Sequence, residues 1–536
     1  MVAKPAQISK PAVRLLHFSR ENAALFVCFL AIYALAAYYI AVVLKLYHND
    51  TIARTALGYF TLYGRDPHLA SVGFIWTPLV SLLQVPMFPL FRVIGEPAFA
   101  GPILGVIFGA AAVPMLNETG RSLNVERSTR FLVVLLFGLH PTILLYAATG
   151  MSETVFFFFM VASIYYILRW ATKQAGYTAI VISATCIALS FWVRYEAIPL
   201  LLSACLTVLV VIFSWYGQHS RTFRESLEAT WITVMLPAVY SVFIWIFFNW
   251  LIMNDPFYWL SGEYSNIAFT YEFRGDTNPL YQNLPGAIAY SLLRVVIQFV
   301  AFPALVIATF WLSYRRKSLM PTAAIWVSIV LVAFHIYQNY TGASYGWYRF
   351  FTYCIPASIP AFFWLLYSIK DNDTWVKTAV IVMIAGMAVS IVTTTIGMAD
   401  PAIGKEESSF VQAIATGGTA PQSESRNWAV SRTVARYIAD NDIDGPILLD
   451  TFQGFAIVLF AEHPEQFVKT QDLDFRDAVR NPREHGIAWV LVPRPDENLY
   501  RNEWILKSYP SIWEEGVPWA QLVENFGDWK LFRVIP

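Results

Sequence analysis

The chain has 536 residues, of which 57% are hydrophobic and 14% charged, whereas an ordinary soluble domain has roughly 45–50% apolar and about 25% charged residues. Its mean hydropathy is +0.50. Basic and acidic residues balance at 37 each, so no basic excess points to nucleic acid as a partner. The composition excludes an ordinary soluble enzyme and indicates a protein that crosses a membrane many times.

Eleven apolar stretches approach the roughly 20 residues that a membrane-spanning helix needs. They cover residues 23–45, 98–116, 131–148, 154–169, 177–193, 197–214, 231–252, 287–311, 321–337, 350–369 and 377–396. A twelfth stretch, Phe74–Ile94, is interrupted by three prolines. We expect this stretch to lie in the outer interface without crossing the membrane.

The positions of Lys and Arg predict the orientation. With eleven spans, sixteen of these residues fall on the side of the N-terminus and only six in the opposite loops, although those loops are longer. Such a bias distinguishes cytoplasmic from outer loops. We therefore expect a multi-pass plasma-membrane protein with a cytoplasmic N-terminus, a retained first span and a long first outer loop at residues 46–97.

The chain divides into a membrane module at residues 1–400, a polar linker at 401–427 and a soluble α/β domain at 428–536. Residues 401–536 hold 13 basic and 20 acidic residues. Short β-rich runs at 446–449 and 488–492 alternate with amphipathic stretches at 428–438 and 475–479, a pattern typical of an α/β domain. An odd number of spans places this domain outside the cell.

Charged residues gather at the predicted outer ends of the helices, where they can converge on one cavity. They are His48, Asp50, Asp66, His68, Glu153, Arg194, Glu196, Asp255, Glu263 and Arg349.

Two carboxylates in this set begin helical stretches. Asp50 follows the first span, where a carboxylate with access to lipid and water can act as a general base, or can simply cap the helix that follows. Glu153 precedes an apolar run, and its carboxylate is costly to bury in the membrane. It can alternatively complement the helix dipole.

The arginines also leave two readings open. Arg194 and Glu196 lie in one turn, where a structural ion pair explains them as well as a catalytic role does. Arg349 precedes a helix at the predicted outer face. There its guanidinium can bind a phosphate through two hydrogen bonds, or its side chain can extend to the membrane surface beside an aromatic belt. Arg294 lies inside a predicted span and is a functional candidate by default, although pairing with a glutamate or with the backbone explains it equally well.

These parts together resemble the GT-C glycosyltransferases, membrane enzymes that use polyprenyl-phosphate-linked sugars and include the protein O-mannosyltransferases and the aminoarabinose transferase of lipid A. The resemblance covers nearly the whole chain and is carried by the order of several weak motifs. They are Asp50 after the first span, Gly64-Arg65-Asp66-Pro67 and Trp76-Thr77-Pro78-Leu79 in the first outer loop, Ser152-Glu153, Arg194-Tyr195-Glu196, and Arg349 before Pro356 and Pro360. The sequence departs from the common family pattern in having Asn49-Asp50-Thr51 where an Asp-Glu pair is frequent.

The resemblance implies that Asp50 removes the proton from an acceptor hydroxyl, with Glu153 as a second catalytic carboxylate. A single well-placed activating carboxylate favours inversion at the sugar. The leaving polyprenyl phosphate carries about −1.5 to −2 charges, so cations should bind it, Arg349 first and Arg294 second. The remaining residues predicted to line the substrate cavity are His48, Asp66, His68, Arg194, Glu196, Trp347 and Tyr348.

The predicted function is transfer of one sugar, a hexose or a pentose, from a polyprenyl-phosphate donor to a glycan, lipid or protein acceptor at the outer membrane face. No cofactor is expected, although Asp50 and Glu153 could instead hold a divalent metal, as carboxylates do in the related oligosaccharyltransferases. The main alternative is a transporter or a flippase for lipid-linked sugars. Transporters usually show repeated halves, which this sequence lacks. A polymerase or ligase acting on diphosphate-linked glycans is a third possibility.

Overall fold

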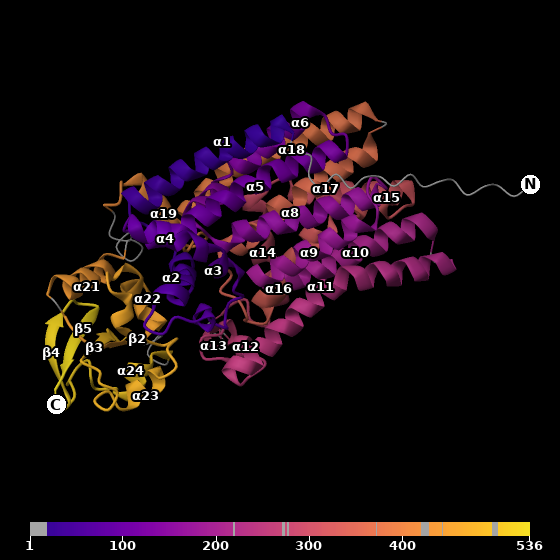
Figure 1. Cartoon of the computed structure of the whole chain (residues 1–536). Helices are drawn as coiled ribbons and strands as arrows, with labels where there is room; N and C mark the ends of the chain where they lie inside the picture. The colour runs from indigo at the N-terminus through magenta and orange to yellow at the C-terminus, as the bar shows by residue number, and fades with distance from the viewer. Residues whose placement is uncertain are drawn as a thin grey trace, which may run out of the picture.

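The structure is a computed structural model, and it describes residues 19–217, 220–270, 274–275, 278–370, 372–419, 428–441, 443–495 and 502–535. It consists of a helical bundle with a small α/β domain against one end (Figure 1). The bundle helices are α1 (Arg20–Ala37), η1 (Tyr38–Val43), α5 (Ala100–Ser122), α6 (Arg127–Gly138), α7 (Pro141–Thr149), α8 (Ser152–Ala171), α9 (Tyr177–Val193), α10 (Ala197–Tyr216), α11 (Arg221–Met253), α14 (Leu284–Gln298), α15 (Phe302–Arg316), α16 (Trp326–Tyr340), η7 (Tyr348–Phe351), α17 (Cys354–Ile369) and α18 (Asp373–Ala399).

Every predicted span falls on these helices. Among the described residues, seven helices are long and apolar enough to cross a membrane, and nine if each of two bent pairs counts as one span. The two remaining predicted spans are α9 and α16, which have 17 and 15 residues. The fold is therefore that of a multi-pass membrane protein.

Two predicted spans are not single helices. The helices α6 and α7 are bent by 56°, and α14 and α15 by 101°. A proline follows each break, Pro141 at the start of α7 and Pro303 near the start of α15. Proline lacks the N–H that a continuous helix needs, so the helix is interrupted at these positions. The stretches predicted as spans at 131–148 and 287–311 are therefore bent helix pairs.

Other side chains form hydrogen bonds with the backbone groups that the two breaks leave without a helical partner, as the hydrocarbon region of a membrane requires. The ring Nε2 of His140, at the first break, lies 3.0 Å from the carbonyl oxygen of Gln298, at the second. Ser390 of α18 accepts a hydrogen bond from the Val300 N–H at 2.9 Å. The two broken helices are thereby fixed to each other and to α18.

The first loop folds into short helices over the end of the bundle nearest the α/β domain. They are α2 (Asn49–Tyr63), η2 (Leu69–Val72), α3 (Leu79–Gln84), η3 (Val85–Met87), α4 (Phe88–Val93) and η4 (Pro97–Phe99). The proline-bearing stretch Phe74–Ile94 holds one apolar helical segment, Leu79–Val93. Its 15 residues would reach about 22 Å, less than the roughly 30 Å of hydrocarbon in a bilayer. Because α16 is equally short, this length does not distinguish the stretch from a span, and its place outside the membrane stays a prediction.

The predicted linker contains a helix. In residues 401–427 the structure shows α19 (Glu407–Ala415), while residues 420–427 lie outside the described residues. The remaining short helices between bundle elements are α12 (Tyr258–Ser261), α13 (Asn266–Thr270) and η6 (Met320–Thr322).

The C-terminal domain is an α/β unit, as predicted. Its elements are α21 (Ala429–Asp440), β1 (Ile447–Leu449), α22 (Thr451–Phe460), η9 (Pro464–Gln466), β2 (Phe467–Lys469), α23 (Phe475–Arg480), β3 (Trp489–Pro493), α24 (Trp504–Ser508), β4 (Ala520–Asn525) and β5 (Trp529–Val534). The sheet has the strand order β2-β1-β3-β5-β4, with β1 parallel to β2 and β3 and the remaining pairs antiparallel.

The sheet shares one of its two cores with the membrane module. Ile447 and Leu449 of β1 lie in a buried cluster that includes Tyr59 and Phe60 of α2, whereas Leu448 faces the opposite cluster. This alternation is what the two-residue period of a strand dictates. The domain is thus packed directly on α2, the helix whose N-terminal end carries Asp50.

Candidate active site

The N-terminal end of α2 presents the Asp50 carboxylate to the interior. His48 is the residue that caps this helix, because its ring Nδ1 accepts the Asp50 backbone N–H at 3.3 Å. The Asp50 side chain is therefore not needed as a cap, and its Oδ2 lies 3.0 Å from an Nη atom of Arg349. The capping role left open by the sequence belongs to His48.

Arg349 lies among three carboxylates. Besides Asp50, its Nη1 is 3.2 Å from Glu406 Oε2 and its Nε is 3.7 Å from Glu153 Oε1. Its side chain is only 8% exposed, so it does not snorkel to the membrane surface. Of these carboxylates, Asp50 is the most exposed at 26%, against 10% for Glu406 and none for Glu153. Asp50 is therefore the carboxylate of this group most open to a substrate.

Glu153 is fixed in place by Arg194. An Nη atom of Arg194 donates to Glu153 Oε1 at 2.9 Å and to Ser152 Oγ at 2.8 Å, while its fork also binds Glu196 at 2.9 and 3.2 Å. The structural ion pair expected between Arg194 and Glu196 is thus present. It extends through Glu153 to Arg349, so the two arginines and the carboxylates between them form one network.

A tight turn places Glu153. Gly150 ends α7 with φ +75°, and α8 begins two residues later. A Cβ atom at Gly150 would lie 2.3 Å from the backbone of Gly101 in α5. Only glycine fits this crossing, which brings the first turn of α8 up to the cluster.

Gln298 positions Arg349. Its side chain lies at the end of α14 and forms a hydrogen bond at each end of η7. Its Nε2 donates to Tyr348 O at 2.7 Å, and its Oε1 accepts from the Thr352 hydroxyl at 2.6 Å. The break between α14 and α15 therefore matters to the site. It ends α14 where Gln298 can fix the segment that carries Arg349.

Nearby arginines lower the pKa of two carboxyl groups in the site. Burial acts to raise the pKa of Asp50, but the charge of Arg349 opposes it and that pKa lies below its usual value. At Glu196 burial also acts to raise the pKa. Arg194 outweighs it and lowers the pKa of Glu196 to about 2. Both groups are therefore ionised near neutral pH.

Sequence reasoning missed two residues of the site. Arg54 lies one turn after Asp50 on α2, 6% exposed, with its guanidinium 4.6 Å from the Trp76 ring and 3.4 Å from Thr77 O. Burial and the charge of Arg194 lower the pKa of Arg54 to about 10. Its four-residue spacing from Asp50 was the available signal. Glu406 had no such signal, because it lies in the predicted linker.

Several predicted residues lie outside the network. Asp66 and His68 approach each other at 3.8 Å, and His68 contacts Ser71. Arg294 is buried, donates to Ala402 O at 3.3 Å and stacks on Tyr290. It therefore holds the segment before α19 and does not reach the cluster.

Other predicted residues border the network or serve the domain contact. Trp347 lies 5.9 Å from the Arg349 guanidinium, and Tyr348 is buried beside it. Asp255 caps a turn by accepting the Phe257 N–H. Glu263 pairs with Lys507 at 3.2 Å and with Arg476 at 3.7 Å, both in the C-terminal domain. Glu263 therefore helps to dock that domain.

Among the described residues, no group of three or more His, Cys, Asp or Glu side chains is placed to hold an ion. The guanidinium of Arg349 instead occupies the space between Asp50 and Glu153, the two carboxylates considered as metal ligands.

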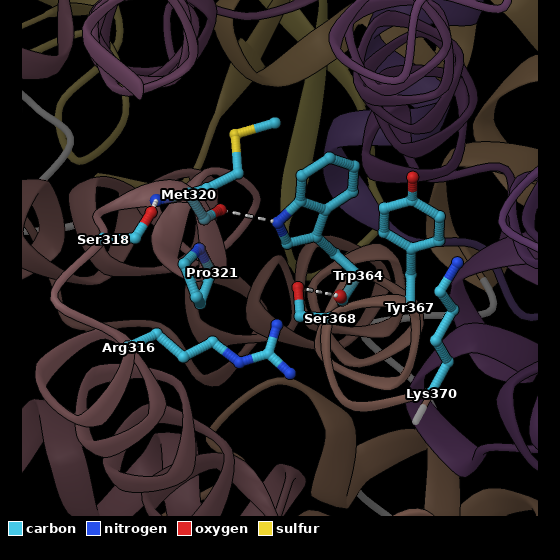
Figure 2. Close-up of a pocket in the computed structure, with 8 residues that line it drawn as sticks. All are labelled: Arg316, Ser318, Met320, Pro321, Trp364, Tyr367, Ser368 and Lys370. Atoms are coloured by element: carbon cyan, nitrogen blue, oxygen red, sulfur yellow. Dashed lines mark hydrogen bonds between the residues drawn. The ribbon is translucent and has the colours of Figure 1, made fainter. Parts of the chain in front are cut away.

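A separate cavity of about 490 Å³ lies near the opposite end of α17 (Figure 2). Its lining residues are Arg316, Ser318, Met320, Pro321, Trp364, Tyr367, Ser368 and Lys370. Arg349 precedes α17, whereas Lys370 follows it, so about 24 Å of helix separates the cavity from the cluster. The cavity is not part of the candidate site.

The fold of this chain is shared with ArnT, which belongs to the group of proteins that the sequence resembles. The chain matches the crystal structure of ArnT from Cupriavidus metallidurans bound to undecaprenyl phosphate, with a TM-score of 0.54 and 12% sequence identity, over 95% of this chain and 97% of that one. It also matches the apo oligosaccharyltransferase of Archaeoglobus fulgidus, with a TM-score of 0.45 and 11% identity, over 87% and 69% of the two chains. No protein-family model and no curated protein match the sequence.

Proposed function

We propose that the protein is a glycosyltransferase that moves one sugar from a polyprenyl-phosphate donor to an acceptor hydroxyl. The observation that carries this proposal is the 3.0 Å contact between Asp50 and Arg349. It joins a partly exposed carboxylate to a buried arginine beneath the first-loop helices. The fold shared with ArnT, a structure bound to undecaprenyl phosphate, supports this donor class.

In the proposed reaction Asp50 takes the proton of the acceptor hydroxyl. The acceptor oxygen then forms a bond to the anomeric carbon, the bond from that carbon to the phosphate oxygen breaks, and its electron pair leaves with the phosphate. Arg349 stabilises the charge that develops on the phosphate. Attack opposite the leaving phosphate inverts the configuration of the sugar. Arginines fill the role of a metal ion in this proposal.

Arg349 holds the pKa of Asp50 below its usual value, so Asp50 is ionised near neutral pH and can accept the proton of the acceptor hydroxyl. Arg54 adds a second positive charge one helical turn from Asp50. Within the described residues it forms no ion pair.

The distribution of Lys and Arg supports a plasma-membrane protein with its N-terminus in the cytoplasm and its C-terminal domain outside. The cluster lies at the end of the bundle that contacts this domain, so the reaction takes place at the outer face. The acceptor is a hydroxyl on a glycan, a lipid or a protein, and the donor sugar is a hexose or a pentose.

Reconstituted vesicles test the proposal. They should contain the purified protein, a polyprenyl-phosphate sugar labelled in both the lipid and the sugar, and candidate acceptors. A transferase releases free polyprenyl phosphate and labels the acceptor. Movement of intact donor across the vesicle membrane without that release would reject the proposal and favour a flippase.

A further inference from the structure

Glu406 occupies an anion position in the site. Its Oε2 lies 3.2 Å from Arg349 Nη1 and 3.3 Å from His48 Nε2, and the residue is 8% exposed. The ring of His48 accepts the Asp50 N–H at its Nδ1, so its Nε2 carries the hydrogen. Two nitrogen atoms from distant parts of the chain therefore lie within ion-pair distance of one carboxylate oxygen.

All three nitrogens of the Arg349 guanidinium face carboxylates, at 3.0 Å for Asp50, 3.2 Å for Glu406 and 3.7 Å for Glu153. Each of these carboxylates competes with a phosphate for this arginine. Asp50 is required as the base, and Glu153 is fully buried and held by Arg194. Glu406 is the remaining carboxylate, and its contacts are those that a phosphate oxygen would make.

We infer that Glu406 occupies the position of the donor phosphate when no donor is bound. It therefore competes with the donor for Arg349 and His48. This inference rests on the proposed function. The donor displaces the Glu406 side chain when it binds, and Glu406 returns to Arg349 when the product phosphate leaves. Glu406 thus weakens the binding of donor and product alike and prevents the lipid phosphate from remaining in the site after transfer.

The exchange needs only a rotation of the Glu406 side chain. The helix that follows it is anchored, because Phe410 stacks on His48 with ring centroids 6.0 Å apart and Glu407 accepts a hydrogen bond from Tyr146 at 2.7 Å. The backbone of α19 therefore stays in place while the neighbouring side chain leaves Arg349.

Glu407 provides a matched control for the loss of a carboxylate at this place. It is fully buried, and burial together with the charge of Glu406 raises its pKa. Neither Arg349 nor His48 contacts it in a hydrogen bond or an ion pair. The variant Glu407→Gln keeps an oxygen for the hydrogen bond from Tyr146 and removes a neighbouring carboxyl group without changing the contacts of Arg349 and His48.

The test measures the dissociation constant for undecaprenyl phosphate in nanodiscs for the wild-type protein and for Glu406→Gln, Glu406→Ala and Glu407→Gln. Loss of one charge-assisted contact to the competing group should tighten binding roughly tenfold in both Glu406 variants. The constant for product inhibition of transfer should fall by the same factor. Glu407→Gln should stay within about twofold of the wild type.

The outcomes separate the inference from the proposed function. Unchanged or weaker binding in both Glu406 variants, with a binding wild type, overturns the inference and leaves the proposed function standing. Equal tightening in Glu407→Gln also overturns it, because the effect would then be one of general charge. A wild type that does not bind undecaprenyl phosphate removes the proposed function, and the inference with it.

Discussion

Replacing Arg349 by glutamine should destabilise the protein strongly. The change removes the charge that lies 3.0 to 3.7 Å from Asp50, Glu406 and Glu153. Removing one partner of a buried ion pair costs about 3–5 kcal/mol, because the other charge stays buried without compensation. Since three carboxylates lose the same partner, we expect a cost near the upper end, about 5 kcal/mol.

A second substitution distinguishes electrostatics from a packing defect. In the double variant Arg349→Gln/Glu406→Gln, one of the three repelling carboxylates is neutral, so the double variant should be more stable than Arg349→Gln alone. Coupling energies between contacting charged residues are about 0.5–3 kcal/mol. Of the two single variants, Glu406→Gln should cost less, because the arginine keeps Asp50 and Glu153.

The assay is thermal unfolding of the purified protein in detergent, with Arg316→Gln as the control. Arg316 is an arginine at the surface of the cavity in Figure 2, and it is exposed, so its loss should leave the melting temperature nearly unchanged. The reasoning is refuted if Arg349→Gln melts within a degree of the control, or if the double variant is less stable than Arg349→Gln.

Two further predictions concern the supports of the site. Gly150→Ala should reduce the yield of folded protein and its melting temperature, because the new Cβ would lie 2.3 Å from the Gly101 backbone, whereas Gly176→Ala, with nothing within 4 Å, should fold normally. Glu196, whose pKa falls from 4.5 to about 2 beside Arg194, should contribute stability that is complete above pH 4.5 and lost as the pH falls toward 2. Melting temperatures measured across that range should fall less in Glu196→Gln than in the wild type, and equal slopes would contradict the pKa shift.

The apolar spans and two of the five strands of the C-terminal sheet could be predicted because their signals are local. Hydrophobic runs of sufficient length identify membrane helices whatever the rest of the chain does, and β-rich runs flanked by amphipathic stretches identify an α/β domain. The strands at 447–449 and 489–493 lie where the sequence placed them. The broken helices also left a signal, since a proline lies at each break.

The contacts within the site depend on tertiary packing and could not be read in the same way. Glu406 meets His48 across more than 350 residues of chain, and only the packing of α19 brings it there. Arg349 could be placed at a helix mouth, but its three carboxylate partners could not be assigned. The sequence also could not separate Asp66, which lies outside the network, from Asp50, which lies within it, because both follow the first span in the same loop.

The central claim is that Asp50 activates the acceptor at a site where Arg349 holds the donor phosphate. The most direct measurement compares the release of polyprenyl phosphate from a polyprenyl-phosphate sugar by the wild-type protein, Asp50→Asn and Asp66→Asn, in the presence of acceptor. General base catalysis contributes about 10²–10⁴-fold, so Asp50→Asn should lose at least a hundredfold of the rate while still binding undecaprenyl phosphate. Asp66→Asn should retain the wild-type rate. Full turnover by Asp50→Asn, or an equal loss in Asp66→Asn, would contradict the account.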